Sequence, residues 1–214
     1  MELTRAEFEA RYTAGNLRIA LIGMSNIGKS YTATRLTKHY DMSLIEVDKI
    51  IWQQLGQGSM ADFADWQGQP YSKDYAAREA KSIELETQAT LEALAMQSRN
   101  PLLDTTGSVI YTDKTVLETL KSKYFIVHIR ASKHAVNMLK KQYFKTPKPL
   151  IWRHHYHDVA GKTPTESIQH CYPDLLSSRA KAYAELADHS LESDFILNPD
   201  TDTSDVFKAL KPAC

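Results

Sequence analysis

Short apolar runs alternate with longer segments of helical character along this chain. Runs typical of buried strands lie at residues 17–22, 44–47, 101–104, 124–129 and 195–197. Helices are predicted to open at Thr4, at a capping-box sequence, and then to cover residues 31–40, 49–55, 60–66, 72–97, 113–121, 132–144, 173–187 and 204–210. Strands that alternate with helices in this way predict a three-layer α/β/α fold around a central parallel sheet.

The loop after the first predicted strand carries the clearest chemical signal. Its sequence GMSNIGKS matches the phosphate-binding pattern G-x-x-x-x-G-K-[ST], and it lies between a strand and a helix. Glycines let such a loop turn its N–H groups inward to hold phosphate oxygens. Lys29 would neutralise the β- and γ-phosphates of a nucleotide, and Ser30 would bind Mg²⁺. The predicted nucleotide-binding residues are Gly23, Met24, Ser25, Asn26, Ile27, Gly28, Lys29, Ser30, Thr32 and Lys141.

Acidic residues end two of the predicted strands. Glu46 and Asp48 follow the second strand, and Asp104 ends the third. Ligands bind beyond the carboxyl ends of the strands in an open parallel sheet, so we expect these acids near the phosphate loop. Glu46 and Asp104 are the candidates to hold Mg²⁺, and Asp48 is the candidate to orient or deprotonate a substrate hydroxyl. Alternatively, Asp48 caps a helix and Asp104 fixes a turn.

These features resemble the shikimate kinases and related small P-loop kinases over roughly residues 17–195. In that family an acid-x-Asp pair ends the second strand and its Asp contacts the substrate hydroxyl, which implies this role for Asp48. A glycine-rich segment that contacts substrate follows the next strand, where this chain has Thr106 and Gly107. A late helix carries an arginine that binds the substrate carboxylate, and Arg179 is similar to it.

The chain departs from this family pattern at several positions. The family's triple glycine is reduced to a single one, and Asp104 precedes it, as an acid does in nucleotide and gluconate kinases. Lys148 replaces the arginine of the family's lid, which keeps the charge and loses the planar fork. Arg78 is the nearest candidate for a second substrate-binding arginine. The resemblance therefore implies phosphoryl transfer without specifying shikimate as the substrate.

Charge along the chain is uneven although its total is zero. The chain has 26 basic and 26 acidic residues, yet residues 121–162 hold a large basic excess with Asp158 as the one acid. This stretch includes a proline-punctuated loop of about residues 145–163, which would close over ATP as a lid and bring Lys148 and Arg153 to the transferring phosphoryl group. A solvated basic face is the alternative interpretation.

Composition excludes several other classes of protein. No apolar run is long enough to span a membrane, and the first residues do not read as a signal peptide, so we expect a cytoplasmic protein. Two cysteines, Cys171 and Cys214, are too few for a disulfide framework. Zinc is disfavoured at His154, His155 and His157, because no Cys pair or H-E-x-x-H motif accompanies them.

We therefore predict a single P-loop kinase domain over residues 1–214, with a lid at about 145–163 and a substrate-binding insert at about 49–75. It would transfer the γ-phosphoryl group of ATP, with Mg²⁺, to a small and anionic hydroxylated metabolite. Shikimate, a nucleoside, a nucleotide and a sugar acid remain open as acceptors. A nucleotide-binding regulatory protein with little transfer activity and a nucleic-acid end kinase are the alternatives, although neutral net charge makes nucleic acid a less favoured partner.

Overall fold

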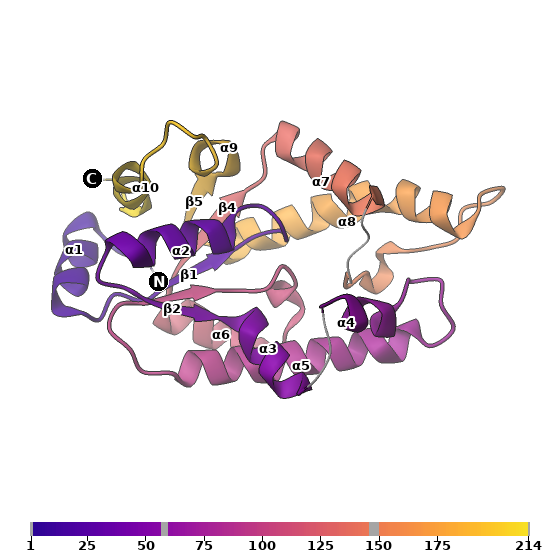
Figure 1. The fold of residues 1–214 in the computed structure, drawn as a ribbon, viewed down its shortest axis with the longest axis horizontal. Coiled ribbons are helices and arrows are strands. Elements are labelled where there is room, and N and C mark those ends of the chain that lie inside the picture. Colours follow the sequence, from indigo (N-terminus) through magenta and orange to yellow (C-terminus); the bar gives the residue numbers. More distant parts are fainter. Residues whose placement is uncertain (1, 57–59, 146–149, 214) are drawn as a thin grey trace.

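Five parallel strands form the centre of the molecule. The computed structural model describes residues 2–56, 60–145 and 150–213, and the sheet within them has the order β2-β3-β1-β4-β5 (Figure 1). The strands are β1 (Ile19–Ile22), β2 (Ser43–Glu46), β3 (Pro101–Asp104), β4 (Phe125–Arg130) and β5 (His189–Glu192). β1 is buried and lies in the middle, so the loop that follows it emerges at the centre of the sheet's carboxyl edge.

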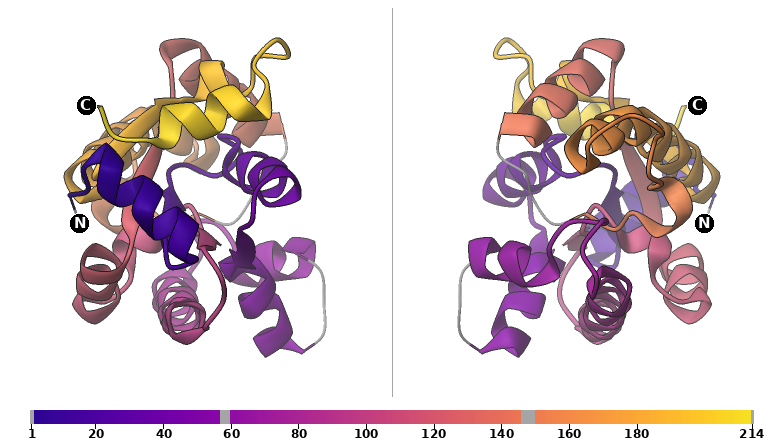
Figure 2. Two further views of the ribbon diagram at one scale, coloured as in Figure 1. Left: turned by 90° about the vertical axis from the view of Figure 1, so that its left-hand side faces the viewer. Right: turned by 90° about the vertical axis from the view of Figure 1, so that its right-hand side faces the viewer.

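Helices cover both faces of this sheet. α2 (Lys29–His39) and α10 (Thr203–Leu210) lie on one face, and α5 (Tyr75–Ala95), α6 (Lys114–Lys123) and α8 (Pro164–Leu186) cover the other (Figure 1; Figure 2). The other helical segments are α1 (Arg5–Ala14), α3 (Val47–Leu55), α4 (Met60–Gln67), α7 (Lys133–Lys145), α9 (Ser193–Ile196) and the 3₁₀ turns η1 (Val109–Tyr111) and η2 (Arg153–His155). The predicted three-layer α/β/α fold is confirmed.

The two terminal helices lie together at one end of the molecule (Figure 1). The predicted capping box opens α1, since the Thr4 hydroxyl accepts a hydrogen bond from the Glu7 amide (3.3 Å) and the Glu7 carboxylate accepts one from the Thr4 amide (2.8 Å). Phe8 of α1 is fully buried, with ring centroids 5.9 Å from Phe125 of β4 and 6.2 Å from Phe207 of α10. These aromatic contacts join both helices to the sheet.

Two sequence predictions are corrected by the fold. The predicted strand at 195–197 is wrong: β5 lies just before it, and Ser193–Ile196 form α9. Ile196 is buried against the phosphate loop, where a Cβ on Gly28 would lie 3.2 Å from its side chain, so tertiary packing explains its apolar character. The last long helix begins at Pro164 rather than at residue 173, because a Thr163 capping box starts it and Pro173 is held inside it.

No helix within the described ranges is long and apolar enough to cross a membrane.

Candidate active site

The phosphate-binding loop leaves β1 in a backbone shape that side chains would obstruct. Gly23 and Gly28 have φ angles of +142° and +103°, and Asn26 has +61°. A Cβ on Gly23 would lie 2.7 Å from the carbonyl oxygen of Ile129, which is too close for any side chain. Gly28 is the N-cap of α2 and offers no capping side chain, so the first turn of this helix is left open to an anion.

Lys29 lies folded onto this loop. Its Nζ donates hydrogen bonds to the carbonyl oxygens of Gly23 (3.1 Å) and Met24 (3.0 Å), and the residue is buried. Burial lowers the pKa of the Lys29 ammonium, while the carboxylates of Asp104, Asp48 and Glu86 act in the opposite direction. Lys29 thus lies within reach of the charges of three acids and of Arg179.

Two of the strand-end acids are neighbours in the sheet. Glu46 and Asp104 are register partners across β2 and β3, and Glu46 forms an ion pair with Lys49. Asp104 is buried, and one oxygen of its carboxyl group has no hydrogen-bond partner. Burial raises the pKa of Asp104, whereas Lys29 and a hydrogen bond from Ser30 oppose the increase.

These oxygens fit a magnesium ion. Mg²⁺ prefers oxygen ligands and is commonly held by one or two carboxylates together with the phosphates of its nucleotide. Asp104 offers an unpartnered carboxyl oxygen and also accepts a hydrogen bond from the side chain of Ser30. A P-loop serine and a strand-end aspartate are the side chains that hold Mg²⁺ in P-loop NTPases. No group of three or more His, Cys, Asp or Glu side chains that could hold a metal ion occurs among the described residues, so an all-protein metal cage is absent there.

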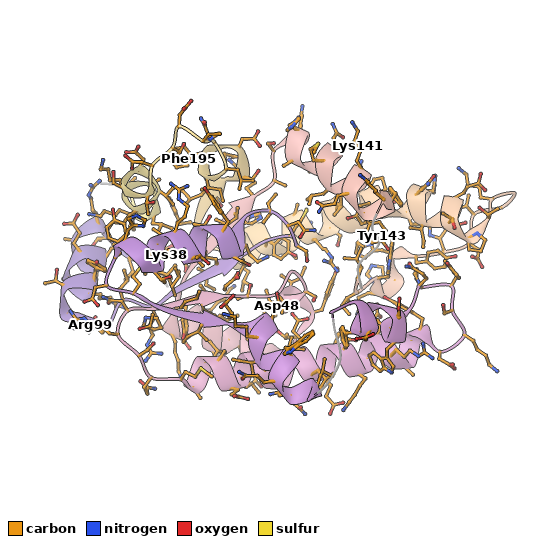
Figure 3. All side chains as sticks on the ribbon, viewed as in Figure 1. Lys38, Asp48, Arg99, Lys141, Tyr143 and Phe195 are labelled. Carbon is orange, nitrogen blue, oxygen red and sulfur yellow. The ribbon has the colours of Figure 1, made fainter. Side chains whose placement is uncertain are left out.

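A pocket of about 210 Å³, called the central pocket below, adjoins the phosphate loop. Asp48 lies on its wall in the first turn of α3, where the chain leaves β2 (Figure 3). Its other lining residues are Ser25, Asn26, Lys29, Ser30, Ile51, Phe63, Gln67, Ser82, Glu86, Thr106, Gly107, Ser108 and Ile151. The phosphate-loop lysine and the predicted acceptor-activating acid therefore share one space.

Gly107 lines this pocket and packs closely against the phosphate loop. A Cβ at this position would lie 2.8 Å from the backbone nitrogen of Ser25, so only glycine allows the close approach to the phosphate loop. Its carbonyl oxygen accepts hydrogen bonds from Arg179 (3.2 Å) and from the hydroxyl of Tyr183. The segment after β3 is thus fixed between the phosphate loop and α8.

Glu86 is a pocket residue that the sequence analysis missed. Its carboxylate accepts hydrogen bonds from the hydroxyls of Thr106 and Ser108. Burial raises the pKa of Glu86 to about 7, although these hydrogen bonds act to lower it. The sequence does carry a signal: Glu79, Ser82 and Glu86 are polar residues at helical spacing on the face of α5 that is otherwise buried.

The three arginines with predicted roles do not line the central pocket. Arg78 donates to the carbonyl oxygen of Trp66 (2.7 Å) and lies 3.7 Å from an Asp74 carboxylate oxygen. Arg153 is exposed in η2. Arg179 is buried on α8, where its guanidinium donates to the backbone carbonyls of Gly107 and Ile151 (2.8 Å).

The remaining predicted residues lie on the lid side. Lys148 falls in the segment 146–149, outside the described residues. Lys141 is exposed on α7 (Figure 3), and Thr32 is buried in α2 with its hydroxyl oxygen unpartnered. A second hollow of about 550 Å³, the outer hollow, is lined by Asn26, Ile27, His134, Ala135, Met138, Leu139, Gln142, Asp194, Leu197, Asn198 and Pro199. The outer hollow is not predictable from local sequence, because the phosphate loop, α7 and the segment that begins in α9 are far apart in the chain.

Similarity to known proteins extends over most of this chain. No family model matches the chain. Shikimate kinases of Xanthomonas oryzae pv. oryzae (strain PXO99A) and Xanthomonas axonopodis pv. citri are 26% and 25% identical, over 82% and 83% of this chain and the same shares of theirs. The solved shikimate kinase of Bacteroides thetaiotaomicron aligns with a TM-score of 0.62 at 17% identity, covering 90% of this chain and 95% of that one.

This chain has a shikimate kinase-like fold. A shikimate kinase from Acinetobacter baumannii, solved in complex with shikimate, aligns with a TM-score of 0.57 at 18% identity, over 85% of this chain and 87% of that one. These alignments extend over nearly the whole shikimate kinase-like fold, including its five-stranded parallel sheet. At such identities they establish the architecture, and the chemistry must be argued from the residues of the site.

Proposed function

We propose that this protein is an ATP-dependent kinase that transfers the γ-phosphoryl group to a hydroxyl of a small molecule. The observation that carries the proposal is the central pocket, where Lys29 of the phosphate loop and Asp48 of α3 line one space. Such a space of about 210 Å³ suits a small metabolite. The names of the similar proteins support the same class of reaction.

The phosphate loop supplies the nucleotide side of this proposal. Its inward N–H groups and Lys29 bind the phosphates, and the lysine then exchanges the Gly23 and Met24 carbonyls for phosphate oxygens. Ser30 and Asp104 hold Mg²⁺, which neutralises phosphate charge when bound. The outer hollow accepts the base, since Met138 and Leu197 are large apolar side chains exposed along it.

Asp48 acts on the acceptor, the molecule that receives the phosphoryl group. Its carboxylate accepts the proton of the attacking hydroxyl, or orients that hydroxyl in line with the γ-phosphate. Thr106 and Gly107 also line the pocket, where Gly107 packs against Ser25 of the phosphate loop. Lys148 and Arg153 of the proposed lid stabilise the negative charge on the phosphoryl group during its transfer.

The test measures ADP release by the full chain with ATP and Mg²⁺, with and without a panel of hydroxylated acceptors. We expect an acceptor to raise ADP release above basal hydrolysis, and Asp48→Asn to lower the acceptor-dependent rate by about 10²–10⁴-fold. Asp174→Asn, at an exposed position of α8, is the matched control. Tight ATP binding without any acceptor-dependent turnover would contradict the proposal and favour a nucleotide-binding regulatory protein.

A further inference from the structure

The segment of residues 150–153, called the strap below, is bonded to neighbouring helices through side chains. The carbonyl oxygen of Leu150 accepts hydrogen bonds from the amide of Gln67 in α4 (2.7 Å) and from the hydroxyl of Tyr75 in α5 (2.6 Å). Gln67 and Tyr75 are both buried. Two helices therefore fix the first residue of the strap.

Glu79 of α5 holds the other end of the strap. One oxygen of its buried carboxylate accepts hydrogen bonds from the backbone amides of Trp152 (2.6 Å) and Arg153 (2.9 Å). Trp152 has right-handed helical angles (φ −91°, ψ −33°), whereas Arg153 has a φ of +54°. Successive residues of opposite hand turn their N–H groups toward one point and form a concavity, called a nest, that binds an anion. Here the anion is the carboxylate of Glu79.

The backbone of Arg153 needs this support. A positive φ is unfavourable for a residue that carries a Cβ, and it persists where the surrounding structure imposes it. An anion in the nest stabilises this conformation, because both N–H groups then share one acceptor. The carboxylate of Glu79 and the left-handed backbone of Arg153 therefore depend on each other.

The strap also forms part of the central pocket. Ile151 lines the pocket, and its carbonyl oxygen accepts a hydrogen bond from Arg179 of α8 (2.8 Å). Arg179 also donates to the carbonyl oxygen of Gly107, a second lining residue (3.2 Å). Because Ile151 directly precedes the nest, Glu79 acts on this wall through the backbone of the strap.

We propose that Glu79 is a positioning residue of the acceptor site: its carboxylate, seated in the nest of Trp152 and Arg153, keeps Ile151 in the wall of the central pocket. The effect on the acceptor rests on the proposed kinase function, whereas the attachment of the strap to α5 does not. The two parts are therefore tested by separate measurements.

The fluorescence of Trp152 reports on the strap without any enzymatic activity. Trp152 is 1% exposed, whereas Trp52 and Trp66 are 42% and 41% exposed, so Trp52→Phe with Trp66→Phe leaves a single, buried tryptophan. In this background we expect Glu79→Ala to raise the acrylamide quenching constant about threefold or more, because the nest loses its acceptor. Glu84→Ala, exposed on the same helix, is the control and should not change it. Unchanged quenching in Glu79→Ala would overturn the proposal.

A pair of substitutions at Arg153 tests the nest with α5 left intact. Arg153→Gly and Arg153→Val both remove an exposed guanidinium, but glycine adopts a positive φ freely and valine does not. We expect the quenching of Trp152 to keep its parental value in Arg153→Gly and to rise in Arg153→Val. Equal quenching in the two variants would show that the nest does not hold the strap.

Kinetics test the effect on the acceptor. With an acceptor that stimulates ADP release, we expect Glu79→Ala to raise the KM of the acceptor about tenfold and to leave the KM of ATP within about twofold. Glu79→Gln keeps an oxygen at the nest and should give an intermediate KM. An acceptor KM that stays at the wild-type value while Trp152 becomes accessible would exclude the positioning role.

The failure of the kinase proposal has a different signature. In that case no acceptor stimulates ADP release by the wild-type protein, and the role of Glu79 in acceptor binding falls with it. The quenching of Trp152 is independent of that result and still decides whether Glu79 holds the strap.

Discussion

At the scale of single residues, Lys29 is the buried cation of the phosphate loop. In this structure its ammonium bonds two carbonyls of its own loop and is surrounded by Asp104, Asp48 and Glu86. Burial penalises its charge, and the three acids offset part of that penalty. A bound phosphate would offset it more directly, so nucleotide binding and the charge of Lys29 support each other.

Replacing this lysine tests its catalytic role. We expect Lys29→Met to lower acceptor-dependent ADP release by about 10²–10³-fold, the usual cost of removing one preorganised charge donor. The fold should tolerate the change, because methionine keeps the volume and removes a buried charge. Lys38→Met, on the exposed side of the same helix (Figure 3), is the control. Wild-type turnover by Lys29→Met would contradict the assignment.

Glu86 makes a residue-scale prediction about pH and stability. Burial raises its pKa from 4.5 to about 7, so the folded state favours the protonated carboxyl. The stability contributed by this protonation is complete below pH 4.5 and is lost as the pH rises through 7, by up to about 3 kcal/mol.

Urea unfolding between pH 5 and 8 checks this. We expect the free energy of unfolding of Glu86→Gln to exceed that of wild type by an amount that grows with pH, while Glu84→Gln follows wild type. A difference that stays constant across this range would mean that Glu86 is not protonated by burial.

At the scale of elements, α5 lines the central pocket directly, and α8 holds one of the segments that line it. α5 contributes Ser82 and Glu86 to the pocket from its buried face. Arg179 of α8 does not line the pocket, but it donates a hydrogen bond to the carbonyl oxygen of Gly107, which does. Pro173 lies inside α8, where it cannot donate a backbone hydrogen bond. The helix nevertheless extends from Pro164 to Leu186, because its start is fixed by a capping box and its buried side chains hold it against the sheet.

The cap of α8 can be tested by itself. The Glu166 amide donates to the Thr163 hydroxyl (3.3 Å) and the Thr163 amide donates to the Glu166 carboxylate (2.7 Å). We expect Thr163→Ala to lower the free energy of unfolding in urea by about 1 kcal/mol. Thr165→Ala, exposed in the same turn, should stay within about 0.5 kcal/mol of wild type. Equal effects of the two substitutions would exclude a capping role.

At the scale of the whole molecule, the two terminal helices stabilise the sheet at the end away from α4 and α7 (Figure 1). Phe8 connects α1, β4 and α10 through its contacts with Phe125 and Phe207. The same face carries Tyr40, whose ring stacks on Phe207 at a centroid distance of 3.9 Å. This aromatic cluster joins segments that are some 200 residues apart in the chain.

We expect Phe8→Ala to lower the free energy of unfolding by about 3–5 kcal/mol, since it removes a fully buried aromatic ring. Denaturant unfolding followed by fluorescence and by circular dichroism should show one shared transition. Phe195→Ala, at a side chain that is 37% exposed, should cost less than about 1 kcal/mol. Loss of α1 alone, with the sheet unaffected, would show that the terminal helices are independent of the core.

The sequence by itself determined the elements that depend on patterns of neighbouring residues. A glycine pattern between an apolar run and a helix defines the phosphate loop, and the alternation of strands and helices defines the layers. Glu46, Asp48 and Asp104 could be placed at the strand ends for the same reason. Their roles stay predictions, since geometry shows where they lie and not what they do.

Only the tertiary structure decided what faces the acceptor. Gln67, Glu86 and Thr106 come from three separate segments, and no pattern along the chain brings them together. The same packing directs Arg179 to backbone carbonyls, although its sequence position suggests a ligand contact. Local sequence sets hydrogen bonding and burial within an element, whereas the charge of a pocket depends on which elements meet, and that is fixed by the packing of the whole core.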